Sequence, residues 1–363
     1  MTGAEITKYM LICRHISLSE WYKMSKVRVA VIGASGFTGL ELIKMLLNHP
    51  CFEIAFLGGS EGGAEIAALH PMLEKIYSRK VEKSEIDRIA NEAQLAFLAV
   101  PHKQATTIAK QLLGRGVKVV DLSADYRLAA QTYEAAYGGA HEDTANLAHA
   151  VYGLPELVGA QAIANARLIA NPGCYPTASL LAILPFAEYI DTDQPIIIDA
   201  KSGVSGAGKA CIERTHFVTV NENCFTYSPI THRHAPEIRE KAAIALDRAV
   251  QVVFVPHLLP ITRGMLASVY IKLKKPLENP TERLREFYKD NQFVRVRNDS
   301  VQIKFVAGTH FADIFAIKDG ETLFVQTAID NLLRGASSSA IANANLMFGC
   351  DPSASLPQLA HGV

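Results

Sequence analysis

The stretch VRVAVIGASGFTGLEL, residues 27–42, decides the fold because an apolar strand, a glycine turn and a helix start follow one another directly. Gly33, Gly36 and Gly39 lie in the turn, spaced G-x-x-G-x-x-G. Glycines at such a turn let the backbone approach a pyrophosphate and leave the first helix amides free to bind it. The same spacing also fits a tight turn without a ligand. Its place on the first strand of a strand-helix series favours dinucleotide binding.

Strands and helices alternate on either side of this turn. Apolar runs at 52–58, 95–101 and 118–124 predict strands, and residues 105–116 have helical periodicity. Such alternation is typical of parallel βαβ units. After residue 171 the chain becomes rich in predicted strands, at 195–203, 250–261, 264–275, 291–299, 310–318 and 322–330. We therefore predict an α/β protein with a Rossmann-type dinucleotide-binding domain followed by a mixed α+β catalytic and dimerisation domain.

The domain boundaries follow from these patterns. We place the first domain at 24–171 and the second at 172–330, then a helix over 331–349 and a C-terminal tail at 351–363. Residues 1–23 have too short an apolar stretch for a signal peptide and acidic residues that a transit peptide lacks. We interpret 1–23 as an N-terminal extension, with a role in subunit contacts as the alternative.

Composition restricts the partners and the compartment. Lys+Arg and Asp+Glu both number 36 in 363 residues, so no global charge favours nucleic acid or an anionic membrane. The 6 cysteines contain no C-x-x-C pair, which indicates free thiols in a reducing, cytoplasmic compartment. No apolar run is long enough to span a bilayer. We expect a small-molecule substrate, with no nucleic acid or membrane partner.

Cys174 is the candidate nucleophile. It lies in NPGCYPT, residues 171–177, between two turn-forming pairs and ahead of an apolar helix. The amides and partial positive charge of a helix start stabilise a thiolate, so this position predicts a lowered thiol pKa. A buried, inert cysteine is the alternative.

A nucleophilic cysteine needs a proton carrier, and HRHAPEI, residues 232–238, offers two imidazoles. His232 and His234 lie on one side of an extended chain, so either can reach a common site. A zinc pair would need a third ligand that no tight spacing supplies, so we expect no metal site.

Anion-binding groups occur in two further segments. In the glycine-rich stretch 202–214, Ser202, Ser205, Lys209 and Arg214 can hold an anion together with backbone amides. Arg263 lies in a turn between two predicted strands, where substrate binding and a structural ion pair fit equally well.

The end of the second strand bears on cofactor choice. Ser60 can donate to a 2′-phosphate, but Glu61 beside it would repel one, and no Lys or Arg lies between residues 45 and 74. NADP and NAD therefore both remain open on these residues.

The chain resembles the N-acetyl-gamma-glutamyl-phosphate reductase family across residues 26–350. The motifs that carry the resemblance are GASGFTGLEL (33–42), LHPML (69–73), FLAVPH (97–102), DLSADYRL (121–128), AVYGLPEL (150–157), ANPGCYPTA (170–178), SGVSGAGK (202–209), HRHAPEI (232–238), PHLLPITRGM (256–265) and DNLLRGA (330–336). Together these ordered motifs separate the family from the aspartate-semialdehyde dehydrogenases, whose architecture and cysteine chemistry are similar.

The resemblance implies an NADPH-dependent enzyme of arginine biosynthesis that forms a thioester on Cys174. It implies His234 as the acid/base, with His232 nearby or as the alternate. The cofactor side is expected to comprise Gly33, Ser35, Gly36, Phe37, Thr38, Gly39, Ser60, Pro101, Ser202, Gly203 and Asn331. The substrate and phosphate side is expected to comprise Asn171, Ser205, Gly206, Lys209, Arg233 and Arg263.

The resemblance also implies that 331–350 packs back on the nucleotide domain and that the protein forms a homodimer or homotetramer. The segment GASSSAIANAN (335–345) departs from the usual GAAGQAVQNMN, so we expect altered cofactor affinity. Two alternatives stay open: a reductase acting on a carrier-bound aminoadipyl phosphate, and a Rossmann protein that binds NAD(P) as a regulator without turnover.

Overall fold

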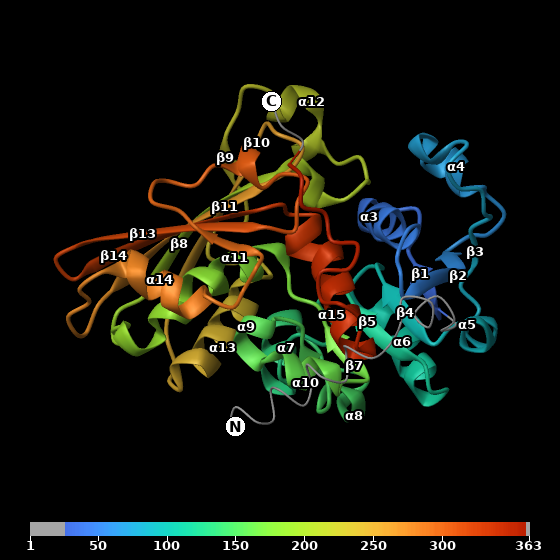
Figure 1. Cartoon of the computed structure of the whole chain (residues 1–363), viewed down its shortest axis with the longest axis horizontal. Coiled ribbons are helices and arrows are strands. Elements are labelled where there is room, and N and C mark those ends of the chain that lie inside the picture. Colours follow the sequence, from blue (N-terminus) through green and yellow to red (C-terminus); the bar gives the residue numbers. More distant parts are fainter. Residues whose placement is uncertain (1–25, 361–363) are drawn as a thin grey trace, which may run out of the picture.

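The computed structural model describes residues 26–360, and the predicted extension 1–23 and the last residues of the tail lie outside them. The described chain forms two lobes side by side, each built on one sheet of seven strands (Figure 1). The predicted fold class is confirmed.

The first sheet is parallel throughout, in the order β3-β2-β1-β4-β5-β7-β6. Its strands are β1 (Val27–Ile32), β2 (Phe52–Gly59), β3 (Glu82–Lys83), β4 (Leu95–Leu98), β5 (Lys118–Asp121), β6 (Val151–Tyr152) and β7 (Leu168–Ala170). The accompanying helices are α3 (Phe37–Leu46), α4 (Ile66–Leu69), α5 (Ile86–Glu92), α6 (Gln104–Gly114), α7 (Ala130–Tyr137), α8 (Thr144–Leu147), α9 (Pro155–Val158) and α10 (Ala160–Ala164), with a 3-10 turn η1 (Pro71–Leu73).

Both faces of this parallel sheet are covered. One apolar cluster joins β1 to α3 and to the last helix, and a second joins the opposite face to α5 and α6. Burial on both faces explains why β1 and β4 are continuous apolar runs without alternation.

The second sheet is mixed, in the order β12-β13-β14-β11-β8-β10-β9. Its strands are β8 (Ile196–Gly203), β9 (Phe225–Thr226), β10 (Val252–Leu259), β11 (Met265–Lys272), β12 (Val294–Val296), β13 (Ala312–Asp319) and β14 (Thr322–Ile329). The helices of this part are α11 (Cys174–Ile183), α12 (Phe217–Val220), α13 (Ala235–Leu246) and α14 (Pro280–Tyr288), with 3-10 turns η2 (Leu184–Tyr189), η3 (Val204–Ala207), η4 (Glu213–Thr215) and η5 (Ile303–Phe305).

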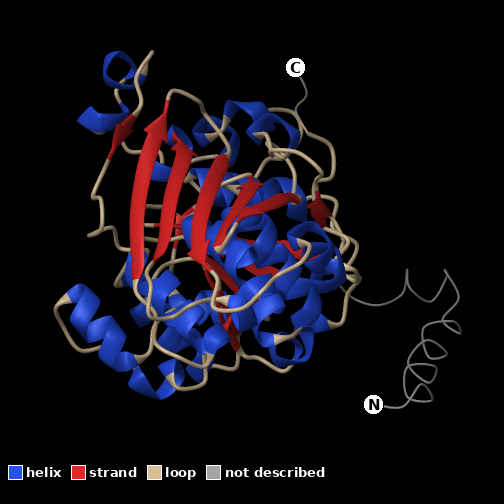
Figure 2. Ribbon diagram, turned by 90° about the vertical axis from the view of Figure 1, so that its left-hand side faces the viewer, coloured by secondary structure: helices blue, strands red, loops and turns tan. Residues whose placement is uncertain are grey.

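Helices cover one face of the second sheet, and the opposite face is covered only at one end, where Val301 and Val306 pack against Ala328. Helices α11, α13 and α14 share an apolar core with its strands. The opposite face carries Ile197, Tyr270, Phe324 and Ile317, which are cross-strand neighbours on β8, β11, β14 and β13. Figure 2 shows the strands of this sheet uncovered toward the viewer.

The chain returns to the first lobe at its end. A π-helical turn, η6 (Leu333–Ser337), leads into α15 (Ser338–Phe348), which runs between the two lobes in Figure 1. Ala340, Ile341 and Ala344 of α15 belong to the apolar cluster of β1 and α3. The last helix thus covers the first sheet, although it follows the second in sequence.

Candidate active site

Cys174 is the first residue of α11, and Gly173 occupies the N-cap position. The helix is buried along its length, so its apolar residues fix where the thiol lies. The N–H of Gly173 donates to Oε1 of Glu237 (3.0 Å). One amide near the helix start is therefore already paired with a buried carboxylate.

The two histidines approach this helix start from α13. His234 is the N-cap of α13, and a Cβ added at Gly173 would lie 2.6 Å from its Nε2, so the imidazole lies directly over Gly173. His232 Nδ1 accepts the backbone N–H of His234 (3.1 Å). His232 thus positions the backbone of His234. Because Nδ1 of His232 is the acceptor, the proton of the neutral His232 ring is on Nε2.

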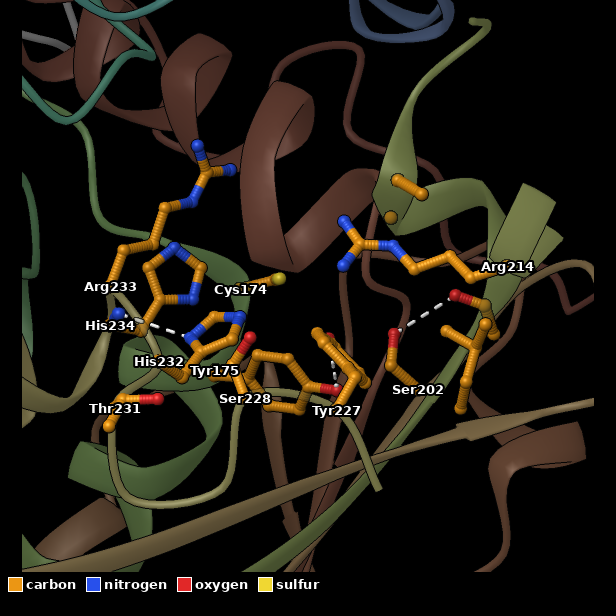
Figure 3. A pocket seen from close by; sticks show the side chains of 14 residues that line it. Cys174, Tyr175, Ser202, Arg214, Tyr227, Ser228, Thr231, His232, Arg233 and His234 are labelled. Atoms are coloured by element: carbon orange, nitrogen blue, oxygen red, sulfur yellow. Dashed lines mark hydrogen bonds between the residues drawn. The ribbon is translucent and has the colours of Figure 1, made fainter. Parts of the chain in front are cut away.

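A cavity of about 470 Å³ opens beside Cys174. Figure 3 shows the thiol between two guanidinium groups, with Arg233 and the histidines on one side and Arg214 on the other. Tyr175 and Tyr227 line the floor, where Tyr227 Oη donates to Tyr175 Oη (2.9 Å). We call this the thiol cavity; its lining is Cys174, Tyr175, Ser202, Gly203, Gly206, Ala207, Arg214, Tyr227, Ser228, Thr231, His232, Arg233, His234 and Leu258.

A second cavity of about 400 Å³ runs from the glycine turn to Cys174. Gly36, Phe37 and Thr38 line one end, Pro101 lies along it, and Asn331 comes from the segment after β14. We call it the glycine-turn cleft. Cys174, Gly206, Arg233 and His234 line both spaces, so the thiol lies where they meet.

The glycine turn fits a dinucleotide. A Cβ at Gly33, where φ is +91°, would lie 2.2 Å from the carbonyl oxygen of Ala99, and one at Gly39 would lie 2.3 Å from that of Gly33. These two glycines let strand, turn and helix pack closely. Gly36 begins α3 without a side-chain cap, which leaves the first helix amides facing the cleft for a phosphate.

Protonation at the site differs from the prediction for a helix-start thiol. Burial raises the pKa of the Cys174 thiol to about 11, opposed by an amide hydrogen bond and by Arg127 and Arg233. Burial also holds the pKa of His234 well below its usual range and lowers that of His232 to about 4. The site therefore holds a thiol beside neutral imidazoles. This differs from the expected thiolate, because burial outweighs the helix end and Glu237 adds a negative charge.

Comparison with known proteins agrees with this arrangement. Residues 28–166 match the family model for the NAD-binding domain of semialdehyde dehydrogenases, and residues 174–331 match that for their dimerisation domain. The N-acetyl-gamma-glutamyl-phosphate reductase of Wolinella succinogenes is 53% identical over 338 residues, covering 93% of this chain and 99% of that protein. The protein of the same name from Sulfurovum sp. is 55% identical over 331 residues, covering 91% of this chain and 98% of that protein.

The chain belongs to the N-acetyl-gamma-glutamyl-phosphate reductase family. The resemblance seen in the motifs is confirmed. Solved structures of similar fold include an aspartate semialdehyde dehydrogenase II from Vibrio cholerae, with 17% identity and a TM-score of 0.69 over 90% of this chain and 99% of that one. The aspartate semialdehyde dehydrogenase of Candida albicans has 14% identity and a TM-score of 0.67, over 89% of this chain and 99% of that one.

Several of the residues predicted for the cofactor side lie in the glycine-turn cleft, on the surface or in the thiol cavity. Gly36, Phe37, Thr38, Pro101 and Asn331 line the glycine-turn cleft. Ser35 and Ser60 are exposed and line neither cavity. Ser202 and Gly203 line the thiol cavity instead of the cleft.

Two residues predicted for the substrate side form contacts within the fold. Asn171 is fully buried. Its side-chain N–H donates to Ala336 O (3.1 Å), and its Oδ1 accepts from Asn343 (3.0 Å), so both ends of the side-chain amide are hydrogen-bonded within the protein. Arg263 forms ion pairs with Glu41 of α3 and with Asp330 (3.6 Å), and it lines neither cavity. Arg263 therefore forms a structural ion pair, which was the alternative to substrate binding.

The other substrate-side residues lie near the thiol. Arg233 and Gly206 line both cavities, and Ser205 lines the cleft and accepts from Asn331 Nδ2 (3.0 Å). Lys209 also lines the cleft, where its Nζ donates to the carbonyl of Leu69 (3.1 Å) in the first lobe. Lys209 therefore lies in the glycine-turn cleft and not in the thiol cavity.

Sequence reasoning missed the buried groups that hold the site together. Arg127 donates to Glu237 (3.1 Å) and to the carbonyl of Leu122 (2.8 Å), and Tyr152 donates to Glu237 (2.8 Å). Glu237 lies in the quoted HAPEI motif and Arg127 in DLSADYRL, but nothing in either segment shows that the two meet. Within residues 26–360, no group of three or more His, Cys, Asp or Glu side chains is placed to hold a metal ion.

Proposed function

We propose that this chain catalyses the NADPH-dependent reduction of N-acetyl-L-glutamyl 5-phosphate to N-acetyl-L-glutamate 5-semialdehyde and phosphate, as its relatives' name indicates. The observation that carries the proposal is the position of Cys174 at the meeting point of the thiol cavity and the glycine-turn cleft. An acyl phosphate in one cavity and a nicotinamide in the other would both reach the same sulfur.

The chemistry runs through a thioester. Sγ of Cys174 attacks the acyl carbon, the carbon–oxygen bond to phosphate breaks, and inorganic phosphate leaves with that electron pair. A nicotinamide cofactor, when bound in the cleft, supplies the hydride that reduces the thioester. The carbon–sulfur bond then breaks, which releases the aldehyde and restores the sulfur of Cys174.

His234 is the proposed proton carrier. Because its pKa is lowered, His234 is neutral, and its imidazole can accept the thiol proton as sulfur attacks the acyl carbon. It returns a proton when the sulfur leaves the reduced carbon. His234 is favoured over His232 because its Nε2 lies over Gly173 and its ring lines both cavities.

The two parts of the chain have different proposed roles. We assign dinucleotide binding to 24–171 with 331–350, and catalysis and subunit contacts to 172–330. The clusters of buried residues support this division, since α15 packs with the first sheet and α11 with the second.

NADP is the proposed cofactor, with the 2′-phosphate at the carboxyl end of β2. The segment 45–74 contains no Lys or Arg, but β3 runs parallel to β2 and places Lys83 in register with Gly59, next to Ser60. A cation from the neighbouring strand offsets the charge of Glu61.

A homodimer is proposed through the uncovered face of the second sheet. This face carries the apolar row Ile197, Tyr270, Phe324 and Ile317, and the family model for the segment describes a dimerisation domain. A second copy would bury side chains that are otherwise open to water. No helix within residues 26–360 is long and apolar enough to cross a membrane.

The test is a coupled assay with N-acetylglutamyl phosphate, run with NADPH and with NADH, on the wild type and on Cys174→Ser. We expect turnover with a preference for NADPH, and loss of turnover in the variant while cofactor binding, followed by calorimetry, is retained. Full phosphate-dependent activity in Cys174→Ser would refute the covalent route.

A further inference from the structure

The proposed substrate carries two anionic groups, and the thiol cavity has a guanidinium on each side of Cys174. The acyl phosphate is one anion and the α-carboxylate at the other end of the glutamyl chain is the second. Arg233 lies on the histidine side of the thiol and Arg214 lies on the opposite side (Figure 3). This inference rests on the proposed function and deepens it.

The two arginines differ in what they can reach. Arg233 lines both the thiol cavity and the glycine-turn cleft, so it lies at the junction where the thiol attacks and phosphate leaves. Arg214 lines the thiol cavity alone. The position next to the departing phosphate is therefore occupied by Arg233, and Arg214 faces the part of the cavity that the rest of the substrate would fill.

Arg214 is available for a ligand. It lies in the turn η4, on the connection between β8 and α13, and its guanidinium carbon is 5.5 Å from the ring centroid of Tyr227. No acidic side chain in the described part of the chain forms an ion pair with it. The Tyr227 hydroxyl donates to Tyr175, so the ring supports the guanidinium without using its donors.

We infer that Arg214 binds the α-carboxylate of the acylated glutamyl substrate and makes the enzyme selective for it. A guanidinium presents paired N–H donors in a fixed fork that matches a carboxylate. With Arg233 at the phosphate end, the two cations fix both ends of the substrate and place the acyl carbon over Sγ of Cys174. A substrate whose α-carboxylate is an amide would keep the phosphate contact and lose the second anchor.

The experiment measures the reverse reaction with two aldehydes, N-acetylglutamate semialdehyde and its α-carboxamide, on the wild type, Arg214→Leu and Arg214→Lys. Arg248→Leu, at an exposed arginine outside both cavities, is the matched control. We expect Arg214→Leu to lower kcat/KM for the acid by about 10- to 100-fold, the range that a charge-assisted hydrogen bond supplies. The carboxamide should react at the same rate in Arg214→Leu as in the wild type, and Arg214→Lys should recover part of the preference.

Three results would overturn the inference. Equal loss for both aldehydes would show a structural role, no loss for either would show no role, and a raised KM for phosphate would place Arg214 at the phosphate instead. A wild type that turns over neither aldehyde would refute the proposed function itself. The two failures are therefore distinguishable.

Discussion

At the scale of single residues, the surroundings of Cys174 decide its chemistry. A helix start favours a thiolate, but here the Gly173 amide is paired with Glu237 and the thiol is shielded from water. Shielding destabilises the charged form more than the remaining amides and the two arginines stabilise it. As the proposed nucleophile, Cys174 would therefore lose its proton during the reaction rather than before it.

The raised thiol pKa predicts a pH dependence. Below a pKa of about 11 the thiolate fraction rises about tenfold for each pH unit, so alkylation of Cys174 by iodoacetamide should accelerate steadily from about pH 7 to about pH 10. Mass spectrometry of the Cys174 peptide separates this site from the exposed Cys211 and Cys224. A rate that is already constant below pH 8 would mean that the thiol is ionised in the free enzyme.

Gly335 sets the room available to the same thiol. A Cβ at Gly335 would lie 2.6 Å from Cβ of Cys174 and 3.0 Å from its Cα, so Gly335→Ala must shift the π-turn η6 or the start of α11. We expect kcat to fall about 100-fold, since a displacement near 1 Å at a reacting atom has an effect of that order. Gly114→Ala, which meets no atom within 4 Å, is the control and should leave kcat unchanged. Comparable kcat values in the two variants would contradict the proposed geometry.

At the scale of elements, one carboxylate joins the two helices that begin at Cys174, the proposed nucleophile, and after His234, the proposed proton carrier. Glu237 lies in the first turn of α13, and it accepts from Gly173 at the start of α11, from Tyr152 and from Arg127. The relative position of the two helix starts therefore depends on a buried ion pair. The sequence pattern of each helix taken alone does not indicate this ion pair.

Glu237→Gln tests this junction. Removing the charge leaves Arg127 buried without a counter-ion, so we expect the free energy of unfolding to fall by about 3 kcal/mol. Since Glu237 also raises the pKa of Cys174, the same variant should shift the pH dependence of alkylation to lower pH. Chemical denaturation and the alkylation assay measure the two effects. The exposed Glu278→Gln should change neither, and an unshifted alkylation profile in Glu237→Gln would argue against the electrostatic link.

Most of the elements could be predicted from local pattern. The helix predicted at 105–116 is α6 (Gln104–Gly114), and the strands predicted at 195–203 and 322–330 are β8 (Ile196–Gly203) and β14 (Thr322–Ile329). The apolar helix that was expected to follow Cys174 includes this residue and begins at it. The residues of α14 were not predicted as a helix, because their alternating charges obscured a buried stripe of Leu284 and Tyr288.

At the scale of the whole molecule, the uncovered sheet face is where subunits are expected to meet. Tyr270 is 41% exposed and pairs across strands with both Ile197 and Phe324. A charge at the centre of an apolar interface is costly to bury. We expect Tyr270→Asp to shift the protein from dimer to monomer in sedimentation experiments, while Lys274→Asp, outside this row, should not. A dimer that persists unchanged in Tyr270→Asp would place the interface elsewhere.

The fold class and the dinucleotide turn could be predicted from the sequence alone, and so could the proposal of Cys174 as nucleophile, because each depends on residues that are neighbours along the chain. A continuous apolar strand, the three glycines and Cys174 before an apolar helix act through local geometry. Roles that depend on distant partners could not be assigned in this way. The three-dimensional packing was needed to show that Arg263 pairs with Glu41, that Asn171 accepts a hydrogen bond from Asn343, and that Glu237 and burial favour the protonated form of Cys174. The physical reason is that ion pairs, desolvation and shared cavities depend on which residues meet in space, and the packing of two sheets brings together segments more than a hundred residues apart.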